Sequence, residues 1–324
     1  MYICAQNYFF LLIFMSEEPI LRKHTRDSWL SYPGQFGLLL SLFGGGVVLL
    51  AILMLGFTLL LGGNIDDAVN YFSMEDMQPA TLRILQIFGS VLQFGLPALL
   101  LAIILRKRIA DFFYLNRKSS SKIVFLVVLL CIFGLAFSDL LTKINHMIPV
   151  SAEAYQRYLQ TEEAYMRQIF KIVDFSTVGY IALSFFILAV LPGFFEELLF
   201  RGALQPILIG WAKSPFWGIF ITAVLFSMMH LSFFGFLPRV FLGMALGYIF
   251  YYSKNLWMSI LFHFLNNAFA VGSFYFYSRK GTLDYAKATE NMPLFISITG
   301  TIVFLVVFYM FYKQSLAEKS LATG

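Results

Sequence analysis

The sequence predicts an all-α, polytopic membrane protein with about eight transmembrane helices, and its composition and the lengths of its apolar runs indicate this class. Of its 324 residues, 59% are hydrophobic and only 13% are charged, against about 45–50% and about 25% in an average soluble domain. This composition excludes disordered, collagen-like and disulfide-rich secreted chains, and two cysteines cannot form a disulfide framework. The net charge of +5 comes largely from basic residues beside apolar runs, which favours membrane anchoring over nucleic-acid binding.

Each predicted span is an apolar run of about 20 residues whose edges are marked by charged residues, Gly or Pro. The sixth run is short and the end of the fourth is poorly marked. Before the first run lie basic residues, after it acidic ones, and after the second basic ones again, which is the positive-inside pattern. In chain order, the predicted spans are 36–61, 84–105, 123–141, 178–200, 216–233, 237–252, 257–277 and 294–312.

The alternation of charge predicts a multi-pass integral membrane protein with both termini in the cytoplasm. The expected organisation is a cytoplasmic N-terminal segment over 1–35, a transmembrane bundle over 36–312 and a cytoplasmic tail over 313–324. Residues 1–14 are apolar but lack a basic flank and a cleavage site, so a signal peptide is disfavoured and Met15 is an alternative start to Met1.

The longest predicted outer segment, 142–177, has apolar side chains at helical spacing with charges between them. We expect an amphipathic helix at the outer membrane interface, where packing is a more common role than gating a substrate.

Ionisable side chains within a span cost at least about 2.5 kcal/mol each, so the few present are candidates for function. The fourth span ends in Glu196 and Glu197, followed by Arg201. Glu197 and Arg201 are four positions apart on a helix and are predicted to pair as a structural clamp. Glu196 is rotated by about 100° from Glu197, lacks such a partner, and is the candidate for a general base.

Further polar groups occur in two later spans. His230 follows Phe226 by four positions in the fifth, and Asn267 follows His263 by four positions in the seventh. Each alone is more often a partner in helix–helix hydrogen bonding. Together with Glu196, they can converge only inside the bundle, which predicts an active site there. Gly243 and Gly247 form a Gly-x-x-x-Gly pair, which is expected to let neighbouring helices pack closely.

These residues give the chain a resemblance to the CPBP family, the CAAX proteases and bacteriocin-processing enzymes, whose bacterial members are often called intramembrane metalloproteases. The matching motifs are Glu-Glu-x-x-x-Arg at Glu196, Phe-x-x-x-His at Phe226 and His-x-x-x-Asn at His263. The resemblance covers roughly 178–277, the expected protease core. It implies an eight-helix intramembrane endopeptidase acting on membrane-associated or lipidated peptides.

Carried over to this sequence, the family mechanism has Glu196 and His230 activate the attacking water. His263 and Asn267 stabilise the oxyanion, while Glu197, Arg201 and Phe226 support the site. A three-ligand zinc site made of Glu196, His230 and His263 is an open alternative, although the spare role for Glu196 as a base favours a metal-free mechanism.

Two other classes of function stay open: a proton- or ion-coupled transporter that uses the same buried groups, and a non-catalytic bacteriocin self-immunity or scaffold protein. No internal repeat of the kind common in secondary transporters is present. The motifs of serine hydrolases with a Gly-x-Ser-x-Gly elbow, of His-Glu-x-x-His zinc proteases and of phosphate-binding loops are also absent.

The predicted depths of two site residues disagree. With a fourth span ending at residue 200, Glu196 lies within roughly 10 Å of the inner membrane edge, but His230 lies about 20 Å deep. Either the fifth helix starts earlier or tilts, or the fourth helix breaks at Pro192 and Gly193 and places Glu196 deeper. The break is the preferred resolution.

Overall fold

The computed structural model describes residues 28–60, 77–283 and 291–323, and these residues form helices and connecting turns without a β-strand. Residues 1–27, which include the predicted apolar N-terminus and both start positions, lie outside the described part. The N-terminal half contains α3 (Tyr32–Leu60), α5 (Pro79–Gly89), α6 (Leu96–Ile104), α7 (Ile109–Phe112), α8 (Ser121–His146) and α9 (Ala152–Ile172). The C-terminal half contains α10 (Val178–Phe185), α11 (Leu191–Glu197), α12 (Gln205–Ala212), α13 (Pro215–Met228), α14 (Phe236–Ser253), α15 (Leu256–Arg279) and α17 (Leu294–Thr323).

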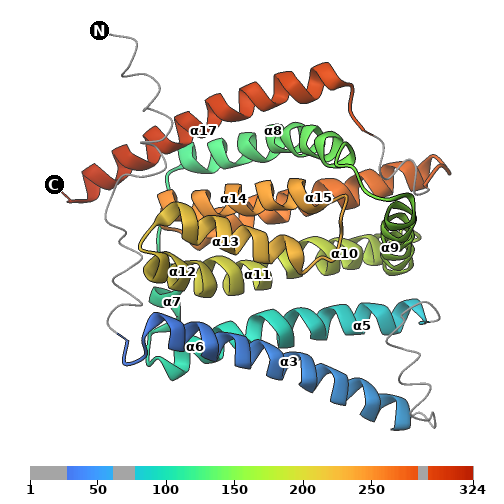
Figure 1. Cartoon of the computed structure of the whole chain (residues 1–324), viewed down its shortest axis with the longest axis horizontal. Coiled ribbons are helices and arrows are strands. Elements are labelled where there is room, and N and C mark those ends of the chain that lie inside the picture. Colours follow the sequence, from blue (N-terminus) through green and yellow to red (C-terminus); the bar gives the residue numbers. More distant parts are fainter. Residues whose placement is uncertain (1–27, 61–76, 284–290, 324) are drawn as a thin grey trace.

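The helices form a bundle whose long axes run roughly side by side (Figure 1). Helix α3 and the α5–α6 pair lie along one side of it, and α8 and α17 lie along the opposite side. The helices from α10 to α15 fill the space between them. The predicted protease core is thus enclosed by helices from both ends of the chain.

Within the described ranges, five helices are long and apolar enough to cross a membrane: Tyr32–Leu60, Pro79–Ile104, Ser121–His146, Val178–Ala212 and Leu294–Lys319. Helix α13 is apolar but shorter. Helices α14 and α15 occupy the sixth and seventh predicted spans but carry polar groups such as Arg239 and His263, which lower their hydropathy. The all-helical membrane class is therefore confirmed, while eight spans stay a prediction.

The fourth predicted span is a continuous helix of 35 residues, from Val178 to Ala212, and the predicted break at Pro192 is wrong. The helix instead widens into π-helical turns at Phe186–Val190 and Leu198–Leu204. Proline follows each of these turns at the second residue of the next α-helical stretch, as it also does after the π-helical turn Ser90–Gly95. Since a proline ring crowds the carbonyl four residues earlier, a wider turn before it lets the helix continue.

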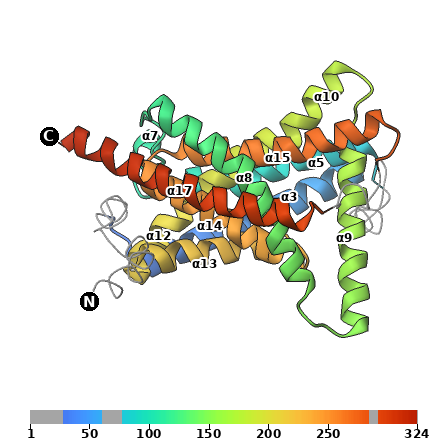
Figure 2. The same cartoon turned by 90° about the horizontal axis from the view of Figure 1, so that it is seen from above.

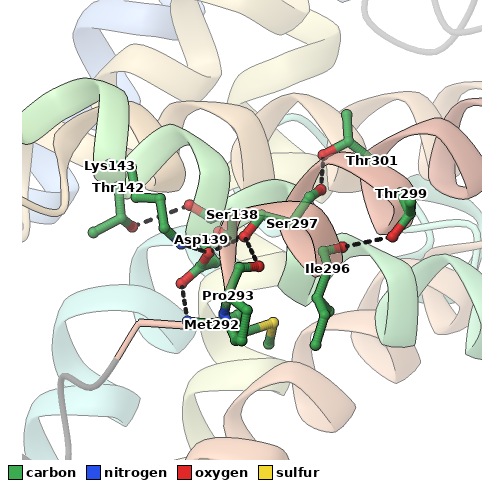
Figure 3. Close-up of polar contacts among 10 residues, drawn as sticks. All are labelled: Ser138, Asp139, Thr142, Lys143, Met292, Pro293, Ile296, Ser297, Thr299 and Thr301. Carbon is green, nitrogen blue, oxygen red and sulfur yellow. Dashed lines mark hydrogen bonds and ion pairs between the residues drawn. The ribbon is translucent and has the colours of Figure 1, made fainter.

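A polar cluster joins α8 to α17 (Figure 3). Asp139 pairs with Lys143 and accepts hydrogen bonds from the Ser297 hydroxyl and from the backbone N–H of Met292, the latter at 2.9 Å. Lys143 also donates to Ser297 at 3.1 Å. The carboxylate of one helix thus satisfies backbone and side-chain donors at the start of the other. Helix α17 then continues through the predicted C-terminal tail to Thr323.

The predicted amphipathic helix in 142–177 is present as α9, which crosses one end of the bundle (Figure 2). The Ser151 side chain caps its first turn by accepting from the N–H of Ala154. Its last residue, Ile172, is buried, and its carbonyl accepts from Arg83 of α5. In the following turn, hydrogen bonds from Ser176 lower the pKa of Asp174. Helix α9 is therefore anchored at its end to α5.

Small residues let the central helices approach closely, as predicted for Gly243. A Cβ atom there would lie 2.8 Å from Cβ of Ala223 in α13. At Gly193 of α11, a Cβ would lie 3.1 Å from the backbone nitrogen of Phe264 in α15. This second contact brings α11 against α15 beside His263.

Candidate active site

The continuous fourth helix removes the predicted difference in depth between Glu196 and His230. Glu196 lies 16 positions before the end of α12 at Ala212, and His230 lies 15 positions after the start of α13 at Pro215. The two helices are neighbours joined by a two-residue turn. At 1.5 Å per residue, both residues lie about 23 Å from that turn. The error in the sequence estimate came from ending the span at residue 200.

Glu197, Arg201 and His263 form the buried centre of the site. Nη1 of Arg201 donates to Oε1 of Glu197 at 2.7 Å, and both side chains are fully buried. The predicted pair four positions apart is therefore present. Nη2 of Arg201 also donates to the carbonyl of Gly243 at 3.2 Å, so the pair fixes the helix to α14.

The same carboxylate orients His263, since Nδ1 of His263 lies 2.8 Å from Oε1 of Glu197. A carboxylate paired with arginine can only accept hydrogen bonds, so Nδ1 of His263 carries the proton and donates it. Nε2 then points to the other side of the ring, where Oε2 of Glu196 lies 3.9 Å away. Glu197 thus sets which nitrogen of His263 faces Glu196.

Glu196 differs from its neighbour in having no close partner. Its side chain is 13% exposed, and its Oε2 atom is buried without a hydrogen-bond partner among the described residues. Oε2 of Glu197 also lacks a partner there, but Oε1 of Glu197 accepts from both Arg201 and His263, so hydrogen bonds hold Glu197 in place and do not hold Glu196.

His230 lies in the turn just after α13, and Phe226 holds it in place. Nδ1 of His230 lies 2.9 Å from the carbonyl oxygen of Phe226, and because a carbonyl can only accept, Nδ1 is the donor and Nε2 is left with its lone pair. The Phe226 ring makes edge contacts with the rings of His230 and His263, at centroid distances of 4.9 and 5.9 Å. The guanidinium of Arg201 lies 4.7 Å from the same ring centroid. Phe226 therefore joins the two histidines and the clamp.

Asn267 is on α15 one turn after His263, and its side chain is half-buried. Its recorded side-chain contact is with Asn266, whose amide donates to it at 3.5 Å. Among the described residues, the structure does not bring Asn267 into hydrogen-bond contact with Glu196 or His230, so only the shared face with His263 connects it to the site.

The zinc alternative would use Glu196, His230 and His263 as its ligands. No group of three His, Cys, Asp or Glu residues within the described ranges is arranged to hold a metal ion. Because Nδ1 of each histidine is already engaged in a hydrogen bond, Nε2 is the nitrogen that each would turn toward a metal.

Arg239, in the first turn of α14, is a site residue that sequence reasoning missed. Its charge interacts with both Glu196 and His230, and its Nη1 atom is buried without a hydrogen-bond partner among the described residues. The signal was available, since Arg239 is a charged residue within a predicted span. It falls outside the three recognised motifs, however, and near the start of its span.

The fold and the site define an integral membrane protein with a buried carboxylate and two histidines inside a helical bundle. Residues 178–269 match the family model described as Type II CAAX prenyl endopeptidase Rce1-like. The predicted resemblance to the CPBP family is thereby confirmed over this segment, and the match supports a CAAX-type intramembrane endopeptidase in general. All seven predicted site residues lie within the matched segment. Neither a curated protein nor a solved structure matches the chain.

Proposed function

We propose that this protein hydrolyses peptide bonds of membrane-associated or lipidated peptides from within the bacterial inner membrane, with both of its termini in the cytoplasm. The observation that carries the proposal is the buried Oε2 atom of Glu196, which has no partner among the described residues and lies 3.9 Å from Nε2 of His263. A free carboxylate oxygen in an apolar bundle is costly unless the reaction uses it. The family match over 178–269 supports peptidase chemistry at this position.

In the proposed mechanism, Glu196 and His230 activate the attacking water. The carboxylate of Glu196 and Nε2 of His230 are both acceptors, so a water between them donates one hydrogen to each. As the water oxygen bonds to the carbonyl carbon, Glu196 takes one proton. Glu196 then delivers that proton to the leaving nitrogen as the carbon–nitrogen bond breaks, which regenerates the free carboxylate.

His263 and Asn267 stabilise the negative charge that develops on the carbonyl oxygen. His263 donates from Nε2 to this oxygen, while Nδ1 stays hydrogen-bonded to the carboxylate of Glu197, which holds the ring in place as a buried acid does in other acid–histidine pairs. The amide of Asn267 is a second donor on the same face of α15. Glu197, Arg201 and Phe226 position these groups.

This mechanism assigns the activation of water to side chains. Elemental analysis of active, chelator-washed protein tests the assignment: we expect full activity without stoichiometric zinc. Activity that disappears with the chelator and returns with added zinc would contradict it.

The central experiment replaces Glu196 with Gln, which keeps the shape of the side chain and removes its ability to accept a proton. Purified protein in proteoliposomes is incubated with a prenylated-cysteine peptide and with an unlipidated transmembrane peptide, and the products are identified by mass spectrometry. We expect cleavage by the wild type and a loss of at least about 100-fold in the variant, with an unchanged melting temperature. The exposed Glu163 of α9 provides the control variant, Glu163→Gln.

Two results would count against the proposal. If Glu196→Gln cleaves as fast as the wild type, Glu196 is not the base. If no peptide is cleaved but Glu196→Gln abolishes a proton or ion flux across the proteoliposome membrane, the same residues serve transport.

A further inference from the structure

The guanidinium of Arg239 lies folded against the backbone at the start of α14. A Cβ atom at Gly235 would be 2.1 Å from Nη1 of Arg239 and 2.7 Å from the hydroxyl of Ser232. Glycine at this position therefore leaves room for the guanidinium, and the Ser232 hydroxyl lies beside the same position. The surface formed by Arg239 and Ser232 around Gly235 is the one considered below. Nη1 is buried without a hydrogen-bond partner among the described residues.

A carboxylate of α9 already reaches this surface. The Ser232 hydroxyl donates a hydrogen bond to Oε1 of Glu162. Stacking of Tyr158 on Phe233, with ring centroids 4.3 Å apart, holds α9 against the same turn. The turn between α13 and α14 thus presents a hydroxyl donor beside an unmatched cation, and the nearest covering helix supplies a carboxylate.

Arg239 is half-buried and has no ion pair among the described residues. Keeping such a cation away from full hydration is costly, which indicates that it meets an anion during function. The tight pair of Glu197 and Arg201 shows the arrangement of a purely structural cation in this fold. The charge of Arg239 acts on Glu196 and His230. A ligand at Arg239 would consequently lie beside the groups proposed to cut the peptide.

We propose that Arg239 and Ser232 form a subsite for a carboxylate of the peptide substrate, next to Glu196, and that Glu162 of α9 borders this subsite when substrate is absent. A guanidinium offers the planar pair of donors that a carboxylate accepts, and the serine hydroxyl adds a third. The carboxylate has two sources, the C-terminus of the peptide or an Asp or Glu side chain near the cleaved bond. The inference rests on the proposed function for the peptide nature of the ligand.

The test compares three forms of one N-terminally palmitoylated fluorescent peptide: the free C-terminal acid, the C-terminal amide, and the amide with a Glu side chain near its end. Binding is measured by fluorescence anisotropy on the Glu196→Gln variant in bicelles, so the readout does not require cleavage. We expect a carboxylate-bearing form to bind about tenfold or more tightly than the plain amide. The form that gains affinity identifies the source of the carboxylate.

Arg239→Gln in the same background should remove that preference, so that the carboxylate forms bind no more tightly than the plain amide. Arg239→Lys, which keeps the charge but loses the planar donors, should keep part of it. The matched control is Arg157→Gln, because Arg157 is an exposed arginine of α9 paired with Glu153. Binding of the amide by every variant serves as the check on folding.

The role of Glu162 gives an independent readout. Glu162→Gln removes the neighbouring carboxylate and should increase affinity for the preferred carboxylate form but not for the amide. Glu163→Gln, on the adjacent position of α9, should change neither.

Equal binding of all three peptide forms would overturn the subsite, as would a preference that survives Arg239→Gln. A carboxylate preference in binding together with no cleavage of any peptide by the wild type would sustain the subsite and refute the hydrolase function. The two proposals can therefore fail separately.

Discussion

Replacing Arg201 with Met tests how much the clamp contributes to stability. Arg201 and Glu197 are both fully buried and joined at 2.7 Å, so the substitution leaves a buried carboxylate with His263 as its one remaining partner. Removing one member of a buried ion pair costs about 3–5 kcal/mol. Since one kcal/mol moves the melting temperature of a large domain by about 2 °C, we expect thermal melting in detergent to fall by at least about 5 °C.

The double variant Glu197→Met/Arg201→Met makes the reasoning refutable. With both charges gone, the remaining penalty is the unpartnered Nδ1 of His263, about 1–3 kcal/mol, so the double variant should melt above the single variant. The double variant should not hydrolyse peptides even though it melts at a higher temperature, because His263 no longer has the acceptor that orients it. Arg157→Met, which breaks an exposed pair of the same spacing, should leave melting unchanged. A double variant that melts no higher than Arg201→Met would refute the argument.

Two further predictions concern packing and the link between α8 and α17. Gly243→Ala should destabilise the protein by about 1–3 kcal/mol, since its Cβ would lie 2.8 Å from that of Ala223. The control is Gly44→Ala, whose Cβ meets nothing within 4 Å. Equal melting temperatures of the two variants would contradict the prediction. Asp139→Asn should lower the melting temperature by leaving Lys143 without its charged partner. The double variant Asp139→Asn/Lys143→Met should melt at a higher temperature than Asp139→Asn alone. A double variant that melts no higher would contradict the ion-pair explanation.

The sequence predicted those contacts of the site that join residues four positions apart in one helix. Glu197 and Arg201 are four positions apart, and helix geometry alone brings such residues together. The hydrogen bond from His230 to the carbonyl of Phe226 spans the same interval. The roles of Glu196, His230, His263 and Asn267 in catalysis stay predictions, because they depend on where a substrate lies.

Relations between helices were harder to predict. The hydrogen bond from His263 to Glu197 requires α11 and α15 to touch, and that approach depends on Gly193 lying against Phe264. The error at Pro192 had a local cause: proline usually ends or kinks a helix, but here π-helical turns absorb it. Hydropathy alone does not contain this information, since a widened turn and a break have the same composition.

The four charged side chains near the centre of the site are matched in two different ways. Glu197 and Arg201 are in direct contact, which offsets the cost of burying both charges but leaves neither free to react. Glu196 and Arg239 interact only through space, and each has a buried polar atom without a partner in the described part of the chain, as Oε2 of Glu197 and Nε of Arg201 also do. Keeping Glu196 and Arg239 apart costs stability, because unpaired groups in an apolar interior lose hydration without gaining a hydrogen bond. The tight pair therefore explains how the bundle tolerates charge, and the separated pair marks where a water and a peptide carboxylate would complete the hydrogen bonding.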